Sequence, residues 1–223
     1  MSKDISLFIG DARELALEHI EPESVDLIYT DPPYPKEFHY LYEWLAQEAV
    51  RVLKPDGFMI AYAGPYWKDV VMQYFDAQLQ YFYDFIMLHK GRTSILYPRK
   101  ILSRYKSMLC YHKNGERPLP NRQVLGLWEG TGEDKRYHHW GQEEQVVRYH
   151  LECFSDEDDL VVDYFLGGGT TGAICKEMGR KFVGFEIDEE SFDISSRRII
   201  ESKPPKGALE QITIFGDDRI TFK

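Results

Sequence analysis

Short apolar runs of strand-forming residues alternate with segments of helical periodicity along most of this chain, and no other feature of the sequence constrains its fold so strongly. Strands are predicted at 5–9, 25–30, 58–63, 81–89, 107–112, 160–165 and 181–188, with an edge strand at 211–215. Helices are predicted at 12–20, 40–53, 66–79, 143–154 and 189–201, with another that ends near 178. Such alternation is typical of an α/β fold, in which a mostly parallel sheet is covered by helices on both faces.

Length and composition favour one folded domain. The 223 residues suit a single domain, 1–223. Apolar residues make up 43% of the chain and charged residues 29%, and this composition excludes wholesale disorder. No apolar run reaches the roughly 18 residues of a membrane span, and no apolar signal segment precedes the first acidic residues. Cys110, Cys153 and Cys175 are spaced too widely for a zinc site or a disulfide framework. We therefore expect no metal, no membrane association and a cytoplasmic location.

Charge is distributed unevenly along the sequence. The formal net charge is −10, which argues against a protein that simply coats nucleic acid. Residues 90–122 nevertheless contain nine Lys or Arg and one acid, Glu116, so this segment is strongly basic within an acidic chain. Two interpretations remain open at this point. The segment is either a surface that contacts phosphates or a solvated loop that offsets acidic neighbours.

Four predicted strands end in residues that carry unusual chemistry. Gly10-Asp11 follows the first strand, and Asp31-Pro32-Pro33-Tyr34 follows the second. Asp163 through Gly169 ends a third strand, and Glu186 lies near the end of a fourth. In parallel α/β sheets, ligands bind at the carboxyl ends of the strands. These four segments together therefore predict a single binding site at that edge.

The glycine-rich turn at 167–169 stands between a strand and a helix. Glycines let a ligand approach the backbone, and the start of the helix offers unpaired N–H groups. Glu186, about 20 residues further on, is placed to accept hydrogen bonds from ribose hydroxyls. The pattern predicts a nucleoside cofactor and excludes a Walker A loop, because no Lys follows in the required place. By itself it leaves NAD, S-adenosylmethionine and a purely structural turn open.

Asp31-Pro32-Pro33-Tyr34 narrows the choice of cofactor. Consecutive prolines hold the backbone rigid and leave carbonyl groups free to accept hydrogen bonds beside the Asp carboxylate. Together these acceptors can hold both hydrogens of an exocyclic amino group, while Tyr34 offers a face for stacking. Such a pocket suits methylation of an aromatic amine. A structural turn with an exposed aromatic ring is the alternative.

In combination, these motifs closely resemble the amino-methylating DNA methyltransferases, which use S-adenosylmethionine to methylate adenine at N6 or cytosine at N4. Asp31-Pro-Pro-Tyr34 precedes Asp163-Tyr-Phe165-Leu-Gly167-Gly-Gly169-Thr-Thr171, as in the permuted beta group. Flanking matches are Gly10-Asp11-Ala12, Ser24-Val-Asp-Leu-Ile28, Leu53-Lys-Pro-Asp-Gly57 and the segment 179–188. The resemblance covers roughly residues 5–200. It implies one Rossmann-like methyltransferase domain with circularly permuted motif order and a restriction-modification setting.

The resemblance also implies roles for the matching residues. The catalytic residues would be Asp31, Pro32, Pro33 and Tyr34, of which Asp31, the Pro32 carbonyl and Tyr34 hold the flipped base. The cofactor-binding residues would be Asp163, Phe165, Gly167, Gly169 and Thr170 at the methionine end, Glu186 at the ribose, and Asp11 with Ala12 at the adenine. Transfer would be direct, without a covalent intermediate, and the chain lacks the Pro-Cys pair that cytosine-C5 methylation requires.

Two positions depart from the family pattern. Relatives usually carry Pro after the first Asp of the cofactor motif, where this chain has Tyr164. Before the helix at 143–154, relatives tend to show a His-Pro-x-Gln-Lys-Pro element. Gln142 matches the Gln of that element, and Glu143 stands where the Lys would be.

The partner implied by the resemblance is DNA, and a homodimer is left open. The segment 90–142 is the candidate recognition insertion within the domain, and its candidate DNA-contact residues are Arg92, Arg99, Lys100, Arg104 and Lys106. Asp at the first position of the tetrapeptide favours adenine N6 in this family. The alternatives are N4-cytosine methylation, methylation of RNA or a protein amide, and a catalytically silent module that binds cofactor or DNA.

Overall fold

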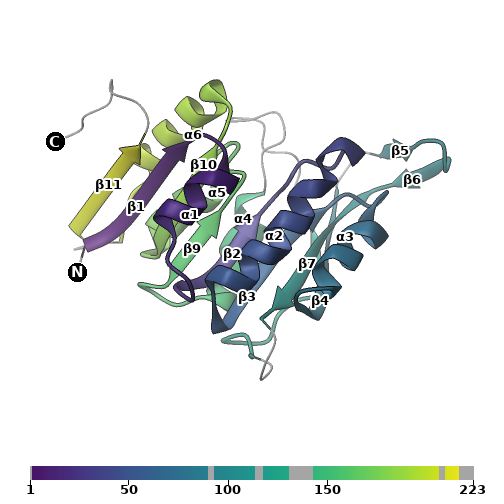
Figure 1. Ribbon diagram of the computed structural model, residues 1–223, viewed down its shortest axis with the longest axis horizontal. Coiled ribbons are helices and arrows are strands. Elements are labelled where there is room, and N and C mark those ends of the chain that lie inside the picture. The colour runs from purple at the N-terminus through teal and green to yellow at the C-terminus, as the bar shows by residue number, and fades with distance from the viewer. Residues whose placement is uncertain (1, 90–92, 114–117, 131–142, 206–208, 216–223) are drawn as a thin grey trace.

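The computed structural model describes residues 2–89, 93–113, 118–130, 143–205 and 209–215, and its centre is one large sheet (Figure 1). The strands of this sheet are β1 (Ser2–Ile9), β2 (Val25–Thr30), β3 (Leu53–Ala63), β4 (Gln80–Leu88), β7 (Tyr105–His112), β8 (Leu127–Glu129), β9 (Leu160–Asp163), β10 (Lys181–Glu186) and β11 (Leu209–Phe215). Their order is β11-β1-β10-β9-β2-β3-β7-β4-β8. In the described sheet, β7 runs antiparallel to β3 and β4, and the other pairings are parallel. The predicted α/β class with a mostly parallel sheet is confirmed.

Helices cover both faces of the sheet, as Figure 1 shows. The described helices are α1 (Ala12–His19), η1 (Lys36–Phe38), α2 (His39–Val52), α3 (Lys68–Asp76), α4 (Glu144–Phe154), α5 (Thr170–Met178) and α6 (Glu189–Glu201). Side chains of α1, α2 and α3 share one buried core, and those of α4, α5 and α6 share the other. None of the helices in the described ranges combines the length and apolar character that a membrane span needs.

Strand β2 shows why an almost continuous apolar run folds at the centre of this sheet. Leu27 and Tyr29 point into the core beneath α4–α6, whereas Ile28 packs into the core beneath α1–α3. All three side chains are fully buried. A strand that is buried on both faces has no polar side, so its sequence reads as continuously hydrophobic rather than alternating.

The chain leaves the neighbouring strands β2 and β9 in opposite directions. After β2 it passes to α2 on one face, and after β9 it passes to α5 on the other face. The two strands pair in parallel, with Leu27 opposite Val161 and Ile28 opposite Val162. A point where adjacent strands send their connections to opposite faces is where open α/β sheets bind ligands. Asp31-Pro32-Pro33-Tyr34 and the glycine turn both lie there.

The structure corrects three details of the predicted elements. Strand β3 begins at Leu53 rather than at 58, because Leu53 pairs with Val25 before the register shifts to place Phe58 opposite Leu27. No strand was predicted between 112 and 143, yet β8 lies there, and at three residues it is too short to show a pattern. The basic stretch contains a hairpin of β5 (Ser94–Leu96) and β6 (Ile101–Ser103).

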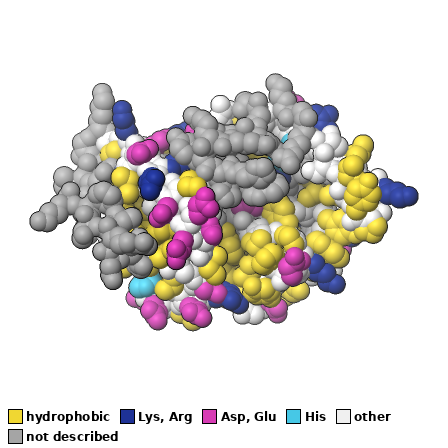
Figure 2. Space-filling view, turned by 90° about the horizontal axis from the view of Figure 1, so that it is seen from above, with side chains coloured by type: hydrophobic (Ala, Val, Ile, Leu, Met, Phe, Trp, Pro, Cys, Tyr) yellow, Lys and Arg dark blue, Asp and Glu magenta, His cyan; other side chains and the backbone are white. Residues whose placement is uncertain are grey.

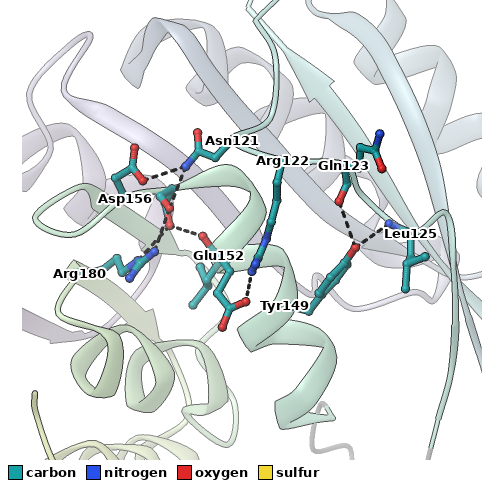
Figure 3. A network of polar contacts seen from close by, with 10 residues as sticks. Asn121, Arg122, Gln123, Leu125, Tyr149, Glu152, Asp156 and Arg180 are labelled. Carbon is teal, nitrogen blue, oxygen red and sulfur yellow. Dashed lines mark hydrogen bonds and ion pairs between the residues drawn. The ribbon is translucent and has the colours of Figure 1, made fainter.

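The segment 118–130 is anchored to α4 by polar contacts (Figure 3). Arg122 forms an ion pair with Glu152, and the Leu125 N–H donates to the Tyr149 hydroxyl at 2.8 Å. Arg122 belongs to the basic stretch that the sequence offered as a phosphate-contact surface. The structure instead places its guanidinium against an acidic partner on α4.

A buried ion pair ties the first two helices to the sheet. Glu48, 4% exposed, accepts from the Arg51 guanidinium at 2.6 and 2.8 Å and from the Tyr164 hydroxyl at 3.2 Å. Arg51 also donates to the carbonyls of Ala16 and Ile20 at the end of α1. One carboxylate therefore holds α1, α2 and the residue after β9 in register.

We expect Glu48→Ala to lower the free energy of unfolding by about 2 to 4 kcal/mol, because it removes the partner of a largely buried guanidinium. Glu48→Gln, which keeps an acceptor oxygen, should lose less. Urea titration of the three proteins measures the difference. Glu43→Ala on the exposed face of α2 is the control and should change stability by less than about 0.5 kcal/mol. Equal losses for the Ala and Gln variants at Glu48 would contradict this account.

Candidate active site

A hydrogen bond between two strand ends joins the tetrapeptide to the glycine turn. Thr30, the last residue of β2, donates its hydroxyl to Asp163 Oδ1 at 2.7 Å and accepts the Tyr164 N–H at 3.2 Å. Asp163, the last residue of β9, also accepts the Phe165 N–H on Oδ1 at 3.1 Å. Because Thr30 and Asp163 are buried, these bonds lie beneath the surface at the switch point.

The buried position of Asp163 changes its pKa. Burial raises its pKa to about 6, and the hydrogen bonds from Thr30 and Phe165 oppose that rise. The negative charge of Asp31 raises it further. An ionised Asp163 is therefore held in the folded protein at the expense of stability.

The glycine turn needs glycine at two positions for different reasons. Gly169, with φ +71°, packs so closely on α6 that an added Cβ would lie 2.8 Å from Cβ of Ser195. Gly167, with φ +49°, is less crowded, since the nearest described atom to an added Cβ is the Phe165 carbonyl oxygen, 3.8 Å away. The left-handed backbone disfavours side chains at both positions. One glycine therefore fits the turn onto α6, and the other keeps the turn open to a ligand.

Arg198 holds the glycine turn in place through hydrogen bonds. Its guanidinium donates to the Gly168 carbonyl and the Thr170 hydroxyl, each at 2.8 Å, and to Glu144 on α4 at 2.7 Å. Arg198 is 8% exposed. Sequence reasoning missed this residue, because position 198 lies beside the apolar stripe of Phe192 and Ile199 on the predicted helix rather than within it.

Glu186 completes the loop region from the end of β10. Its carboxylate accepts the N–H groups of Gly167 at 2.7 Å, Ile187 at 2.9 Å and Asp188 at 3.0 Å. A carboxylate has about four lone-pair sites, so capacity remains for a further donor. The predicted ribose acceptor therefore has its orientation held by backbone groups.

Asp11 caps α1 and already has a cationic partner. Its carboxylate accepts the Arg13 N–H at 2.9 Å and the Arg13 guanidinium at 2.6 Å. The bond to Arg13 is the chief cause that lowers the pKa of Asp11. Ala12 is buried in the first turn of the helix. The predicted contact of Asp11 and Ala12 with the cofactor adenine stays a prediction.

Asp31, Pro32, Pro33 and Tyr34 form a rigid loop after β2. The Tyr34 hydroxyl donates to Asp31 Oδ1 at 2.6 Å. The Tyr42 hydroxyl on α2 lies 3.3 Å from the Pro32 carbonyl oxygen, which retains a second lone pair. Thr30 and Tyr42 were not among the predicted site residues. The position of Thr30 directly before the tetrapeptide was the available signal for it, whereas Tyr42 gave none.

The predicted DNA-contact residues separate into different places. Arg99, Lys100 and Arg104 are exposed on and beside the β5–β6 hairpin, and the Arg99 guanidinium lies 4.3 Å from the Tyr66 ring centroid. Lys106, in contrast, is the second residue of β7, and its Nζ lies 3.4 Å from Asp31 Oδ2. Arg92 lies outside the described residues, as do residues 131–142 with the Gln142 position.

The hairpin also exposes large apolar side chains. Figure 2 looks onto the edge where the parallel strands end, and it shows hydrophobic side chains gathered at the right with Lys and Arg at the margin. The large apolar side chains exposed on the hairpin are Ile95, Tyr97, Ile101 and Leu102. Lys113, also from the basic stretch, pairs with Glu23 at 2.5 Å instead of joining this surface.

The described residues therefore bring the tetrapeptide Asp31-Pro32-Pro33-Tyr34 and the glycine turn together at one switch point. Among them, no group of three or more His, Cys, Asp or Glu side chains could hold a metal ion.

Comparison with known proteins gives a consistent assignment. The family model of N6/N4 DNA methylases matches residues 25–197. The chain is 24% identical over 230 residues to the type II methyltransferase M.HpaI of Haemophilus parainfluenzae, covering 82% of this chain and 71% of that protein. It is 26% identical over 247 residues to the DNA adenine methyltransferase YhdJ of Escherichia coli K12, covering 85% of this chain and 81% of that protein.

Solved structures share the fold. The M1.HpyAVI complex with S-adenosylmethionine superposes with a TM-score of 0.71 at 22% identity, covering 87% of this chain and 98% of that one. The cytosine-N4-specific PvuII methyltransferase superposes with a TM-score of 0.74 at 20% identity, covering 99% of this chain and 89% of that one. The family match extends over most of the chain and includes both motifs of the site. The chain therefore belongs to the N6/N4 DNA methylase family, the S-adenosylmethionine-dependent enzymes that methylate an exocyclic amino group of a DNA base.

Proposed function

We propose that this methyltransferase moves the methyl group to N6 of adenine in DNA by direct transfer. The observation that carries the proposal is the 2.7 Å bond from Thr30 to Asp163, which places the acceptor loop beside the glycine turn. Asp31 at the first position of the tetrapeptide and the naming of the relative YhdJ as an adenine methyltransferase both favour adenine. N4 of cytosine is the alternative, since the PvuII enzyme with the same fold is cytosine-N4-specific.

The acceptor loop would act by holding the amino group of a flipped base. The Asp31 carboxylate and the Pro32 carbonyl each retain an acceptor site, so two amino hydrogens have two oxygens to bind. This withdraws the nitrogen lone pair from conjugation with the ring and directs it toward the methyl donor. Transfer would form the N–C bond as the methyl–sulfur bond of the donor breaks, and the positively charged amino nitrogen would then release one proton to water. The neighbouring carboxylate of Asp31 favours that charge while it exists.

The glycine turn fits S-adenosylmethionine. Gly167 is less crowded than Gly169, and Glu186 keeps an acceptor site for a ribose hydroxyl. Asp163, Phe165, Gly169 and Thr170 would line the methionine end, held in place by Arg198. S-adenosylmethionine, when bound, supplies an activated methyl group as the electrophile. The residues of this chain contribute position and exclusion of water rather than a nucleophile.

The β5–β6 hairpin would contact DNA beside the flipped base. Arg99 and Lys100 supply positive charge next to exposed Tyr97, and apolar or aromatic wedges flanked by cations are found where proteins open a duplex. Lys36 lies 5.8 Å from the Trp67 ring centroid close to the same edge, so further cations and aromatics border the acceptor loop. The homodimer considered from the sequence stays a prediction.

We expect the wild-type protein to transfer labelled methyl from S-adenosylmethionine to unmethylated genomic DNA, with the label in N6-methyladenine. Asp31→Ala should abolish transfer because it removes one of the two amino-group acceptors, while cofactor affinity stays within a few fold. Nucleoside analysis and cofactor titration measure both. Label in N4-methylcytosine would select the alternative base, and label in RNA or protein the alternative substrates. Equal loss of transfer and cofactor affinity in the variant would contradict the separate roles of the two loops.

Asp163→Asn should stabilise the cofactor-free protein at neutral and alkaline pH. The hydrogen bonds from Thr30 and from the Phe165 N–H both end on Oδ1, which an amide retains, whereas the ionisable group is removed. Because the folded-state pKa of Asp163 is raised to about 6, wild-type stability falls as pH rises from about 4 through 6, and the variant escapes this fall. The gain should approach about 1 to 3 kcal/mol above about pH 7 and vanish below about pH 4.

Urea unfolding from acid to alkaline pH measures this difference. Asp193→Asn on the exposed face of α6 is the control and should show no such pH dependence. A stability difference between wild type and Asp163→Asn that stays constant with pH would contradict the account.

Replacing Arg99 and Lys100 together by Gln should weaken DNA binding and reduce the slope of log K against log salt by about 2, because two DNA phosphates are then no longer neutralised by the protein. The matched control replaces Lys113 and Arg122 by Gln. These residues come from the same basic stretch and carry the same charge, but they pair with Glu23 and Glu152. Equal changes in the two double variants would show a general charge effect and remove the hairpin from the interface.

A further inference from the structure

Both oxygens of the Asp31 carboxylate have a donor from the protein. Tyr34 donates its hydroxyl to Oδ1 at 2.6 Å, and the ammonium of Lys106 lies 3.4 Å from Oδ2. The same ammonium lies 5.5 Å from the ring centroids of Tyr34 and Tyr62. Lys106 therefore contacts the tetrapeptide at two of its four residues.

The backbone that carries Lys106 is among the most constrained in the molecule. Strand β7 lies between β3 and β4 in the sheet, and Lys106 pairs with Met87 of β4. The next residue, Ser107, pairs with Ala63 at the end of β3. The Lys106 side chain is 18% exposed, in contrast to the exposed Arg99 and Lys100 of the hairpin. Its position beside Asp31 is set by the central sheet rather than by a surface loop.

The other described groups whose pKa values respond to the charge of Asp31 are all acids. Asp163 on β9 is close enough for the charge of Asp31 to raise its pKa, so two carboxylates lie together at this edge. The phenols near Asp31 belong to Tyr29, Tyr34, Tyr42 and Tyr62, and burial raises the pKa of each. These phenols are neutral at physiological pH. Among the residues that the structure describes, Lys106 supplies the cation paired with Asp31.

We propose that Lys106 is a positioning residue for methyl transfer, an inference that rests on the proposed function. Its ammonium and the Tyr34 hydroxyl together orient the Asp31 carboxylate, so that the remaining lone pairs face the amino group of the flipped base. The ammonium also offsets the repulsion between Asp31 and Asp163. Lys106 thus acts through Asp31 and leaves DNA phosphates to the hairpin.

The first test compares Lys106→Met with Lys106→Arg. The Met variant should lower kcat about 10- to 100-fold, because a misplaced acceptor no longer aligns the amine. KM for DNA, the salt slope of DNA binding and cofactor affinity should change less than about 3-fold. The Arg variant, which restores a cation, should recover most of the loss. An unchanged kcat with raised KM and a reduced salt slope would instead make Lys106 a phosphate contact and overturn the proposal.

A matched control variant is available at another Lys–Asp pair. Lys54 lies 2.6 Å from Asp26, near the starts of β3 and β2 and thus at the edge of the sheet opposite to Asp31. Lys54→Met removes a cation from that pair and should leave kcat and KM unchanged. A loss of kcat equal to that of Lys106→Met would show that breaking any such ion pair disturbs the enzyme, and it would overturn the specific role of Lys106.

The second test is a double-mutant cycle with Asp31→Asn, which keeps an acceptor oxygen but loses the charge. If Lys106 acts through Asp31, adding Lys106→Met to Asp31→Asn should lower kcat by less than about 3-fold. If Lys106→Met lowered kcat as much in the Asp31→Asn protein as in the wild type, the proposal would be overturned.

The wild-type protein, Asp31→Asn, Lys106→Met and the double variant also distinguish failure of this proposal from failure of the proposed function. If the wild-type protein transferred no methyl to DNA, the proposed function would fail by itself. Urea unfolding of these proteins would then still test whether Lys106 and Asp31 interact. Non-additive midpoints of the single and double variants would support the contact, and additive midpoints would refute it.

Discussion

The hydrogen bond from Thr30 to Asp163 is the interaction on which the site depends. It connects the ends of β2 and β9, the two neighbouring strands from which the chain departs to opposite faces. Asp31 follows the first residue of this pair, and the glycine turn follows the second. A small change in the pairing of these strands would separate the proposed amino-group acceptors from the proposed cofactor loop. The core around β2 and β9 therefore holds the geometry that the proposed reaction requires.

Two buried carboxylates of this fold have different surroundings. Glu48 is buried with the Arg51 guanidinium and contributes to the packing of α1 and α2. Asp163 is buried with hydrogen bonds from Thr30 and the Phe165 N–H, and its raised pKa records the unfavourable environment of its charge. A group whose ionised form opposes folding is typical of a functional site. The contrast supports the proposed place of Asp163 in the cofactor site.

Local sequence predicted most of the fold because each central strand is a short, strongly apolar run bounded by Gly, Pro or Asp. It also predicted both loops of the site, since Asp31-Pro32-Pro33-Tyr34 and Gly167 to Gly169 are contiguous. Sequence reasoning missed Arg198, which reaches the glycine turn from a helix almost 30 residues away. It also placed Lys106 in a basic stretch with Arg122. In the structure, Lys106 pairs with Asp31 and Arg122 pairs with Glu152.

The sequence alone therefore determined the α/β class, the acceptor tetrapeptide and the glycine turn, because turn chemistry and apolar periodicity act over a few residues. The tertiary structure decided which cations serve the site and which support the scaffold. It also decided that Tyr164 donates its N–H to Thr30 and its hydroxyl to Glu48. Such pairings join residues more than 100 positions apart. Strand order and helix packing place them together, and no local pattern encodes that proximity.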